Sequence, residues 1–255
     1  MNDQNIYTGR NSQIGQYLPD NLHYVHYDIE DELTWGFLQD CRNLFLVVPK
    51  IPRALDHCKE FVYAAKIAGV KKIVKIGSLG SWRVIHNQID AYIRDCGINC
   101  ISFDMSVLMN NIFTEQYIGT TLLNYRHDTP APYLDPKVLA KSIEQAMNRE
   151  ALLNFNIKAT GRYQYSIEDV QRILEYNGYP VTSIKTTHNN QLHKNAGVSA
   201  DQRLMSAISD DYELGIYPKV SMDLNMFSAA HRTLEDFVEQ DSQYFLNLQA
   251  GDKNL

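Results

Sequence analysis

The chain has 255 residues, of which 44% are hydrophobic and 21% charged, and its net charge is −6. These values are typical of a globular protein with one large domain, and the negative charge argues against binding nucleic acid, which needs clustered lysine and arginine. No apolar run approaches the roughly 18 residues of a membrane span. Residues 1–5 are polar and do not resemble a signal peptide, so we expect a cytoplasmic protein without membrane partners.

Strand and helix signals alternate through the first hundred residues. Each apolar or alternating run is followed by a helical pattern that ends at a glycine, a proline or a polar turn. We expect strands at 6–8, 22–29, 43–48, 72–76 and 98–103, and helices at 32–40, 53–68 and 86–96. This alternation predicts a parallel sheet with helices on both faces. The lysine pair at 71–72 is expected to be a solvated strand entry.

The second half of the chain is more helical. Ser166 and Asp169 have the spacing of a capping box at the start of a helix. The expected elements are helices at 136–147, 166–177, 200–209 and 233–245, strands at 153–159 and 181–185, and a polar loop at 188–197. The four cysteines form no CxxC pair and no zinc-ligand pattern, so we expect reduced thiols and no metal.

A glycine turn follows the first predicted strand. Thr8 ends the strand, and Gly9 and Gly15 occupy two of the three glycine positions of a dinucleotide-binding loop. In that motif the backbone approaches a pyrophosphate at a helix N-terminus. The middle glycine position is Ser12, and Pro19 cuts the helix short. Two interpretations stay open: a nucleotide site that still works, and one that has been lost.

The sequence resembles the NmrA-like branch of the atypical short-chain dehydrogenases. The matching runs are 43–49, 64–80, 92–98, 109–111, 134–136 and 232–238. The resemblance implies a Rossmann-like doubly wound parallel sheet at 1–135, of the NAD(P)-binding type. It also implies that residues 136–255 supply closing elements and a small, mostly helical substrate subdomain. Members of this family include NAD(P)H-dependent reductases of quinones and small natural products, and non-enzymatic redox-sensing regulators.

The N-terminal unit departs from the family pattern, because a strand–helix–strand unit needs about 30 residues. Residues 6–29 must hold two strands, so one strand–helix unit is expected to be shortened or missing. The missing strand would end in the charged residue that selects NAD or NADP. Asp28 lies near the expected distance beyond Gly9 and is a candidate for binding an adenosine ribose. The run 28–31 also matches the acidic turn that the family carries after its third strand.

The active-site Tyr-x-x-x-Lys pair of the superfamily is absent, so other residues are candidates for catalysis. The family has Arg-Pro after the sixth strand, where this chain has Phe103 and Asp104. Asp104 is either a local turn cap or a general acid–base group. His86, at a predicted helix start, is either structural or a proton shuttle. Tyr133 is a further candidate proton donor.

Several other residues are candidates for ligand binding by their place after strands or by the resemblance. Ser78 either binds a ligand or satisfies its own loop, and Pro49 follows another strand. The candidate substrate-binding residues are Asn87, Met105, Asn110 and Asn111.

We therefore expect an enzyme acting on a small molecule, by resemblance an NAD(P)H-dependent reductase. If the nucleotide site is lost, redox-neutral chemistry such as cyclisation, isomerisation or elimination is the expectation. A ligand-sensing regulator without catalysis is the alternative. An exposed sheet edge would invite pairing, which makes a homodimer a further hypothesis.

Overall fold

The computed structural model describes residues 4–8, 14, 17–18, 22–49, 51–80, 83–124, 129–186, 219–227 and 231–249. Two compact units divide the chain. The first comprises Met1–Met105, Lys137–Ala159 and Asp223–Ala229, and the second comprises the segments between and after them. The chain therefore crosses between the units several times, which differs from the single boundary after residue 135 that the sequence suggested. Within the described part, no helix is long and apolar enough to span a membrane.

The first unit contains a six-stranded sheet in which every neighbouring pair is parallel. The strands run in the order β2-β1-β3-β4-β5-β8. Their bounds are β1 Gln4–Thr8, β2 His23–Val25, β3 Cys41–Leu46, β4 Lys72–Ser78, β5 Asn99–Met105 and β8 Phe155–Ala159. This confirms the predicted doubly wound α/β fold.

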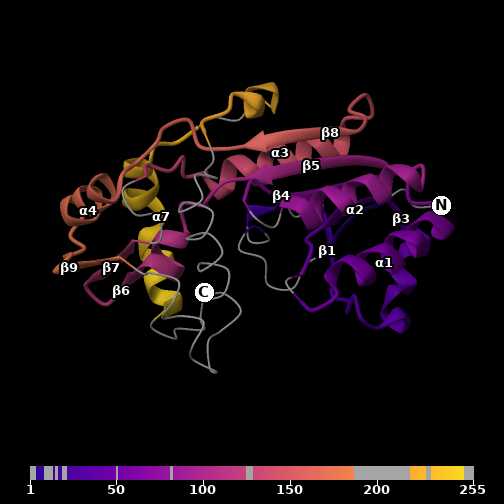
Figure 1. Ribbon diagram of the computed structural model, residues 1–255, viewed down its shortest axis with the longest axis horizontal. Helices are drawn as coiled ribbons and strands as arrows, with labels where there is room; N and C mark the ends of the chain where they lie inside the picture. Colours follow the sequence, from indigo (N-terminus) through magenta and orange to yellow (C-terminus); the bar gives the residue numbers. More distant parts are fainter. Residues whose placement is uncertain are drawn as a thin grey trace. The chain divides into compact units, whose positions relative to one another are not determined.

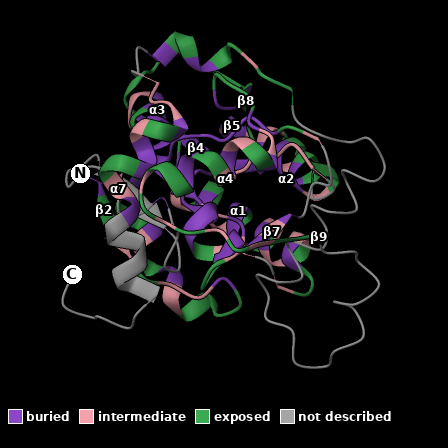
Figure 2. Ribbon diagram, turned by 90° about the vertical axis from the view of Figure 1, so that its left-hand side faces the viewer, coloured by how far each residue is buried: buried purple, intermediate pink, exposed green. Residues whose placement is uncertain are grey.

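Helices cover both faces of this sheet (Figure 1). The 3-10 helix η2 (Glu32–Asp40) packs on α1 (Ala54–Ala68), and α1 packs on α2 (Arg83–Asp95), which contacts β4 and β5. Opposite them lies α3 (Pro136–Asn148), and the short η4 (Asp223–Phe227) contacts β8. Strands β3, β4 and β5 are buried over most of their length, as expected for central strands covered on both faces (Figure 2).

The sheet is one strand short at its β2 edge. The classical doubly wound order is 3-2-1-4-5-6. Here β2 pairs with β1 from Ile6↔His23 to Thr8↔Val25, and no further strand lies beyond β2 among the described residues. This confirms the prediction that one N-terminal unit is shortened or missing. The glycine positions Gly9, Ser12 and Gly15 lie outside the described residues.

Lys72 corrects one expectation about the strand entry. It is buried rather than solvated, and its Nζ donates to the main-chain oxygens of Ala146, Met147 and Arg149 at 3.1, 3.4 and 2.7 Å. These carbonyls end helix α3 and have no acceptor role inside the helix, so the ammonium group caps it. Lys71 is exposed, as expected.

We expect Lys72→Met to destabilise the protein by about 1–3 kcal/mol, because three main-chain carbonyls at the end of α3, two of them on buried residues, lose a charged donor. The matched control is Lys71→Met, expected to change the unfolding free energy by less than about 0.5 kcal/mol. Urea unfolding measures both. Equal effects of the two substitutions would contradict the capping role.

The described part of the second unit combines a small sheet with helices. Its sheet has the order β6-β7-β9, with β6 Tyr117–Ile118, β7 Thr121–Asn124 and β9 Ser183–Thr186. Its helices are the π-helix η3 (Ile112–Gln116), α4 (Ile167–Tyr176) and α7 (Leu234–Gln249). The predicted capping box of Ser166 and Asp169 is confirmed at the start of α4. The helix predicted at 200–209 lies outside the described residues.

Candidate active site in the parallel-sheet unit

The carboxyl ends of β4 and β5 lie in register. Gly77 pairs with Asp104, and Ser78 pairs with Met105, the last residue of β5. Ligands of open parallel sheets bind beyond this edge. Met105 is half-buried there. The Ser78 hydroxyl accepts a hydrogen bond from the Gly80 amide at 3.1 Å, so it does at least satisfy its own loop.

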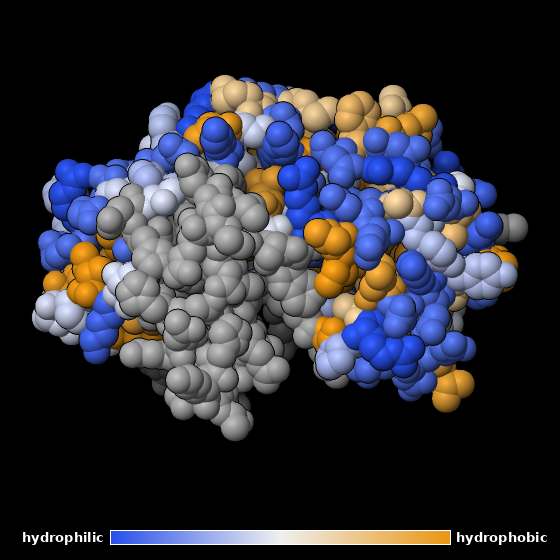
Figure 3. Space-filling view, in the orientation of Figure 1, coloured by the Kyte–Doolittle hydropathy of each residue, from blue (hydrophilic) through white to orange (hydrophobic). Residues whose placement is uncertain are grey.

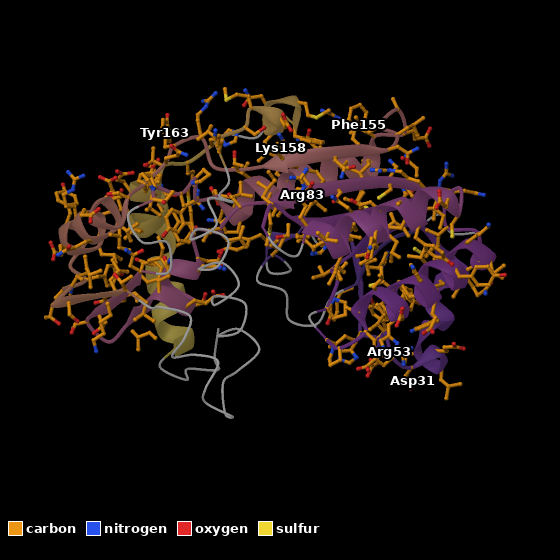
Figure 4. The ribbon with its side chains drawn as sticks, viewed as in Figure 1. Asp31, Arg53, Arg83, Phe155, Lys158 and Tyr163 are labelled. Atoms are coloured by element: carbon orange, nitrogen blue, oxygen red, sulfur yellow. The ribbon has the colours of Figure 1, made fainter. Side chains whose placement is uncertain are left out.

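The carboxyl ends of β1, β2 and β3 form the other part of this edge. Thr8 ends β1 and pairs with Leu46, the last residue of β3, and Pro49 follows β3 half-buried. Asp28 comes three residues after β2, the strand beside β1. Its Oδ1 accepts from the Glu30 amide at 3.0 Å. The amide of Asp31, the N-cap of η2 that is labelled in Figure 4, donates to the main-chain oxygen of Asp28 at 3.2 Å.

A buried polar network lies between α2 and the sheet. Lys75 on β4 is fully buried, and its Nζ lies 2.9 Å from Oδ1 of Asp90 on α2. The same Nζ lies 3.2 Å from Ser102 Oγ on β5 and 3.4 Å from Nδ1 of His86. The Ser102 hydroxyl donates to Asp104 Oδ1 at 2.9 Å. Asp104 and His86, the two residues predicted for acid–base catalysis, are therefore joined through Lys75 and Ser102, which were not predicted as site residues.

Opposing effects act on the pKa of the Asp104 carboxyl. Burial raises its pKa, whereas the hydrogen bond from Ser102 and the charge of Lys75 lower it. Two smaller influences follow: Asp90 raises the pKa and Arg83 lowers it. Arg83 is the exposed first residue of α2 (Figure 4). A carboxyl of raised pKa near a ligand-binding edge is suited to exchanging protons near neutral pH.

Glycine at position 77 makes room for this carboxyl. A Cβ atom built on Gly77 would lie 2.0 Å from Asp104 Oδ1 and 2.7 Å from Ser102 Oγ. Both distances are far inside van der Waals contact, so any side chain at position 77 would displace the Asp104 carboxyl. The close approach of these side chains to the β4 backbone therefore requires glycine.

The thiols near the network are not nucleophiles. Burial raises the pKa of Cys58 and of Cys100 to about 12, although Lys75 lowers both. The Cys100 thiol donates to Asp90 Oδ1 at 3.6 Å. Both side chains therefore stay protonated at physiological pH. All four cysteines are free in the structure.

The remaining predicted site residues lie apart from this network or in the second unit. Asn87 is exposed on α2. In the second unit, Tyr133 is fully buried and donates to Gln116 Oε1 at 2.9 Å. Asn110 and Asn111 are buried at the start of η3, and the Asn111 Oδ1 finds no hydrogen-bond partner within the described part of the chain.

Sequence reasoning missed Lys75, Asp90 and Ser102. A sequence signal was present for the first two. Lys75 interrupts an apolar strand that lies between buried neighbours, where a lysine is expected only with a partner. Asp90 follows His86 by four residues, which places both on one helix face, the face that also carries the buried Ile89 and Ile93.

Solved structures that share this fold include reductases bound to NADP(H) or NADPH. Triphenylmethane reductase of Citrobacter sp., solved with NADP(H), is 16% identical with a TM-score of 0.74, covering 93% of this chain and 99% of that one. An NADPH-dependent quinone oxidoreductase of Escherichia coli, solved with NADPH, is 16% identical with a TM-score of 0.76, covering 94% and 99%.

A mutant of NmrA is 12% identical with a TM-score of 0.71, covering 96% of this chain and 97% of that one. These likenesses confirm the NmrA-like resemblance at the level of the fold. No protein-family model matches the chain, and a search of curated proteins found no match.

Proposed function

We propose that the chain is a nicotinamide-dependent reductase of a small quinone-like or conjugated carbonyl molecule. The position of Asp28 carries the proposal. In doubly wound folds the strand beside the first one ends in an acidic residue that binds the adenosine ribose. Here β2 is that strand and Asp28 follows it. Two reductases of the same fold were solved with NADP(H) or NADPH.

The residues present fit a dinucleotide that has a free ribose 2′-hydroxyl. An ionised carboxylate offers about four acceptor positions, so the bond from Glu30 to Asp28 leaves capacity for ribose hydroxyls. By the sequence motif, the pyrophosphate would lie on Thr8, Gly9, Ser12 and Gly15, of which only Thr8 is among the described residues. The nicotinamide end would lie near Pro49 and Ser78. When bound, this cofactor would supply a hydride.

The same turn disfavours a 2′-phosphate. Asp28 is followed by Glu30, Asp31 and Glu32, which are exposed. Two unit charges of like sign about 5 Å apart repel by about 0.8 kcal/mol even in water. A phosphate dianion facing one such carboxylate therefore loses more than about tenfold in affinity. We infer a preference for NADH, which differs from the cofactors of the two similar reductases.

The test is to measure the direct binding of NADH and of NADPH to the protein, by nicotinamide fluorescence or by calorimetry. We expect NADH to bind at least about tenfold more tightly, and Asp28→Ala to weaken NADH by about 10- to 100-fold through loss of a charged hydrogen bond. Asp40→Asn, an exposed acid at the end of η2, is the matched control and should leave binding unchanged. Tighter binding of NADPH would sink the assignment of Asp28.

A second function is favoured by the buried network itself. Acid–base groups beside a ligand-binding edge can isomerise or eliminate without a hydride. If neither cofactor binds up to millimolar concentration, this redox-neutral chemistry on the same class of small molecule becomes the better proposal.

A further inference from the structure

The hydrogen atoms of the buried network can be assigned from its acceptors. An ammonium group has three N–H bonds, and Lys75 Nζ has three partners: Asp90 Oδ1, Ser102 Oγ and His86 Nδ1. Ser102 Oγ therefore accepts from Lys75 and turns its own proton to Asp104 Oδ1. His86 Nδ1 accepts, which places the imidazole proton on Nε2. One buried cation thus fixes the orientation of two other groups.

This network is not explained by stability. Replacing a buried ion pair by apolar residues of similar volume is often neutral or stabilising. Here His86 and Asp90 lie on the buried face of α2 beside Ile89 and Ile93, where apolar side chains are the usual choice. Asn156 on β8 donates to Asp90 Oδ2 at 3.2 Å, so the second carboxylate oxygen is held as well. Such costly arrangements are expected at functional sites.

Two members of the network reach the surface. Asp104 is 6% and His86 9% exposed, whereas Lys75 and Ser102 are 0% and Asp90 1% exposed. Of the two, Asp104 lies near the carboxyl end of β5, whereas His86 lies on α2. The positive charge of Arg83 on α2 lowers the pKa of Asp104. Lys158 on β8 pairs with Asp104 in the register of the sheet. Figure 4 shows Arg83 and Lys158 on neighbouring elements of this unit. Asp104 is therefore the member of the network that lies at the strand ends, where ligands of open parallel sheets bind.

We propose that Asp104 is the proton donor to the substrate and that Ser102 and Lys75 are positioning residues that hold its carboxyl and stabilise the carboxylate left behind. The proposal rests on the reductase function above and names its acid. It also fits the redox-neutral alternative, in which Asp104 would exchange a proton with the same class of substrate.

The proton-transfer step balances. As the substrate takes up a hydride, the O–H bond of the Asp104 carboxylic acid breaks and a new O–H bond forms on the substrate oxygen. The resulting carboxylate accepts a hydrogen bond from the Ser102 hydroxyl at 2.9 Å. The Lys75 ammonium group donates to that same hydroxyl at 3.2 Å. Asp104 then recovers a proton from water at the exposed edge.

The test follows the Asp104 carboxyl itself by NMR of protein labelled with ¹³C at the aspartate carboxyl carbons, with Asp104→Asn identifying the signal. We expect Asp104 to titrate above the usual value of about 3.9. Ser102→Ala should raise that pKa further, because it removes a donor to the ionised form. A general acid works below its pKa, so activity should fall as pH rises through this value, and at a higher pH in Ser102→Ala.

Ser142→Ala is the matched control, since Ser142 is also fully buried but donates to Val138 O inside α3. It should move neither the titration nor the pH profile. Asp104→Asn should lower kcat by about 10²- to 10⁴-fold with NADH binding unchanged. A normal Asp104 pKa, or one that Ser102→Ala leaves in place, would overturn the proposal even if the protein binds no cofactor. Failure of cofactor binding alone would overturn the reductase function and leave the acid in place.

Discussion

Lys75→Met is expected to destabilise the protein by about 3–5 kcal/mol, which approaches the total stability of many domains. The substitution conserves much of the side-chain volume but removes the ammonium group. Asp90, 1% exposed, would keep a buried negative charge whose cation at 2.9 Å is gone. The hydrogen bond from Asn156 and the Cys100 thiol cannot replace a full charge. Thermal or urea unfolding measures the loss.

The charge-neutral double variant separates this explanation from loss of packing. In Lys75→Met with Asp90→Asn, no charge is stranded, so we expect most of the lost stability to return. Lys71→Met, on the exposed residue at the entry to the same strand, should have almost no effect. A double variant as unstable as the single one would show that Lys75 acts by packing and would contradict the ion-pair account.

The fold could be predicted from the sequence because its signals are local and repeated. The apolar run at Leu44–Leu46 and the helix stop at Gly69 both agree with the structure, where Gly69 is left-handed with φ of 92°. The shortened N-terminal unit was predictable by arithmetic alone, since residues 6–29 are too few for the usual unit. The family resemblance implied a doubly wound sheet, and the structure supplied the order of its strands.

The candidate site was predicted only in part, because its organisation is tertiary. Asp104 stood out at the end of a strand, and His86 at the start of a helix. Nothing in the local pattern shows that a lysine from β4 joins them, since the register of β4 on β5 decides which side chains meet. The environment of Lys72 could not be predicted for the same reason. The main-chain oxygens at the end of α3 that accept from its ammonium group lie about 75 residues later in the chain.

Gly77→Ala is expected to lower kcat by about 10²-fold, the scale of a 1 Å misplacement of a reacting group. The new Cβ would stand 2.0 Å from Asp104 Oδ1 and 2.7 Å from Ser102 Oγ, so the carboxyl must leave its place. Overpacking of this kind costs typically about 1–3 kcal/mol of stability, which leaves a protein that can be assayed. Steady-state kinetics and the carboxyl titration of Asp104 measure the result.

The physical reason for this expectation is the geometry of neighbouring strands. Gly77 and Asp104 are partners in register, so their side chains rise from the same face. Only a hydrogen at position 77 lets the carboxyl lie over the β4 backbone within reach of the Ser102 hydroxyl. Pushed outward, Asp104 becomes better hydrated and loses that donor. Because burial is the largest influence on its pKa, the value should fall toward that of an ordinary aspartate.

Gly36→Ala is the control, because a Cβ at Gly36 in η2 would meet nothing within 4 Å. It should leave both kcat and the Asp104 titration unchanged. If Gly77→Ala kept the activity and the raised pKa, the acid would not depend on this contact and another residue would have to position it. If activity fell while the Asp104 titration stayed in place, the glycine would serve the substrate rather than the acid. The two readouts together therefore test whether the absence of a single side chain on β4 is what holds the acid in position.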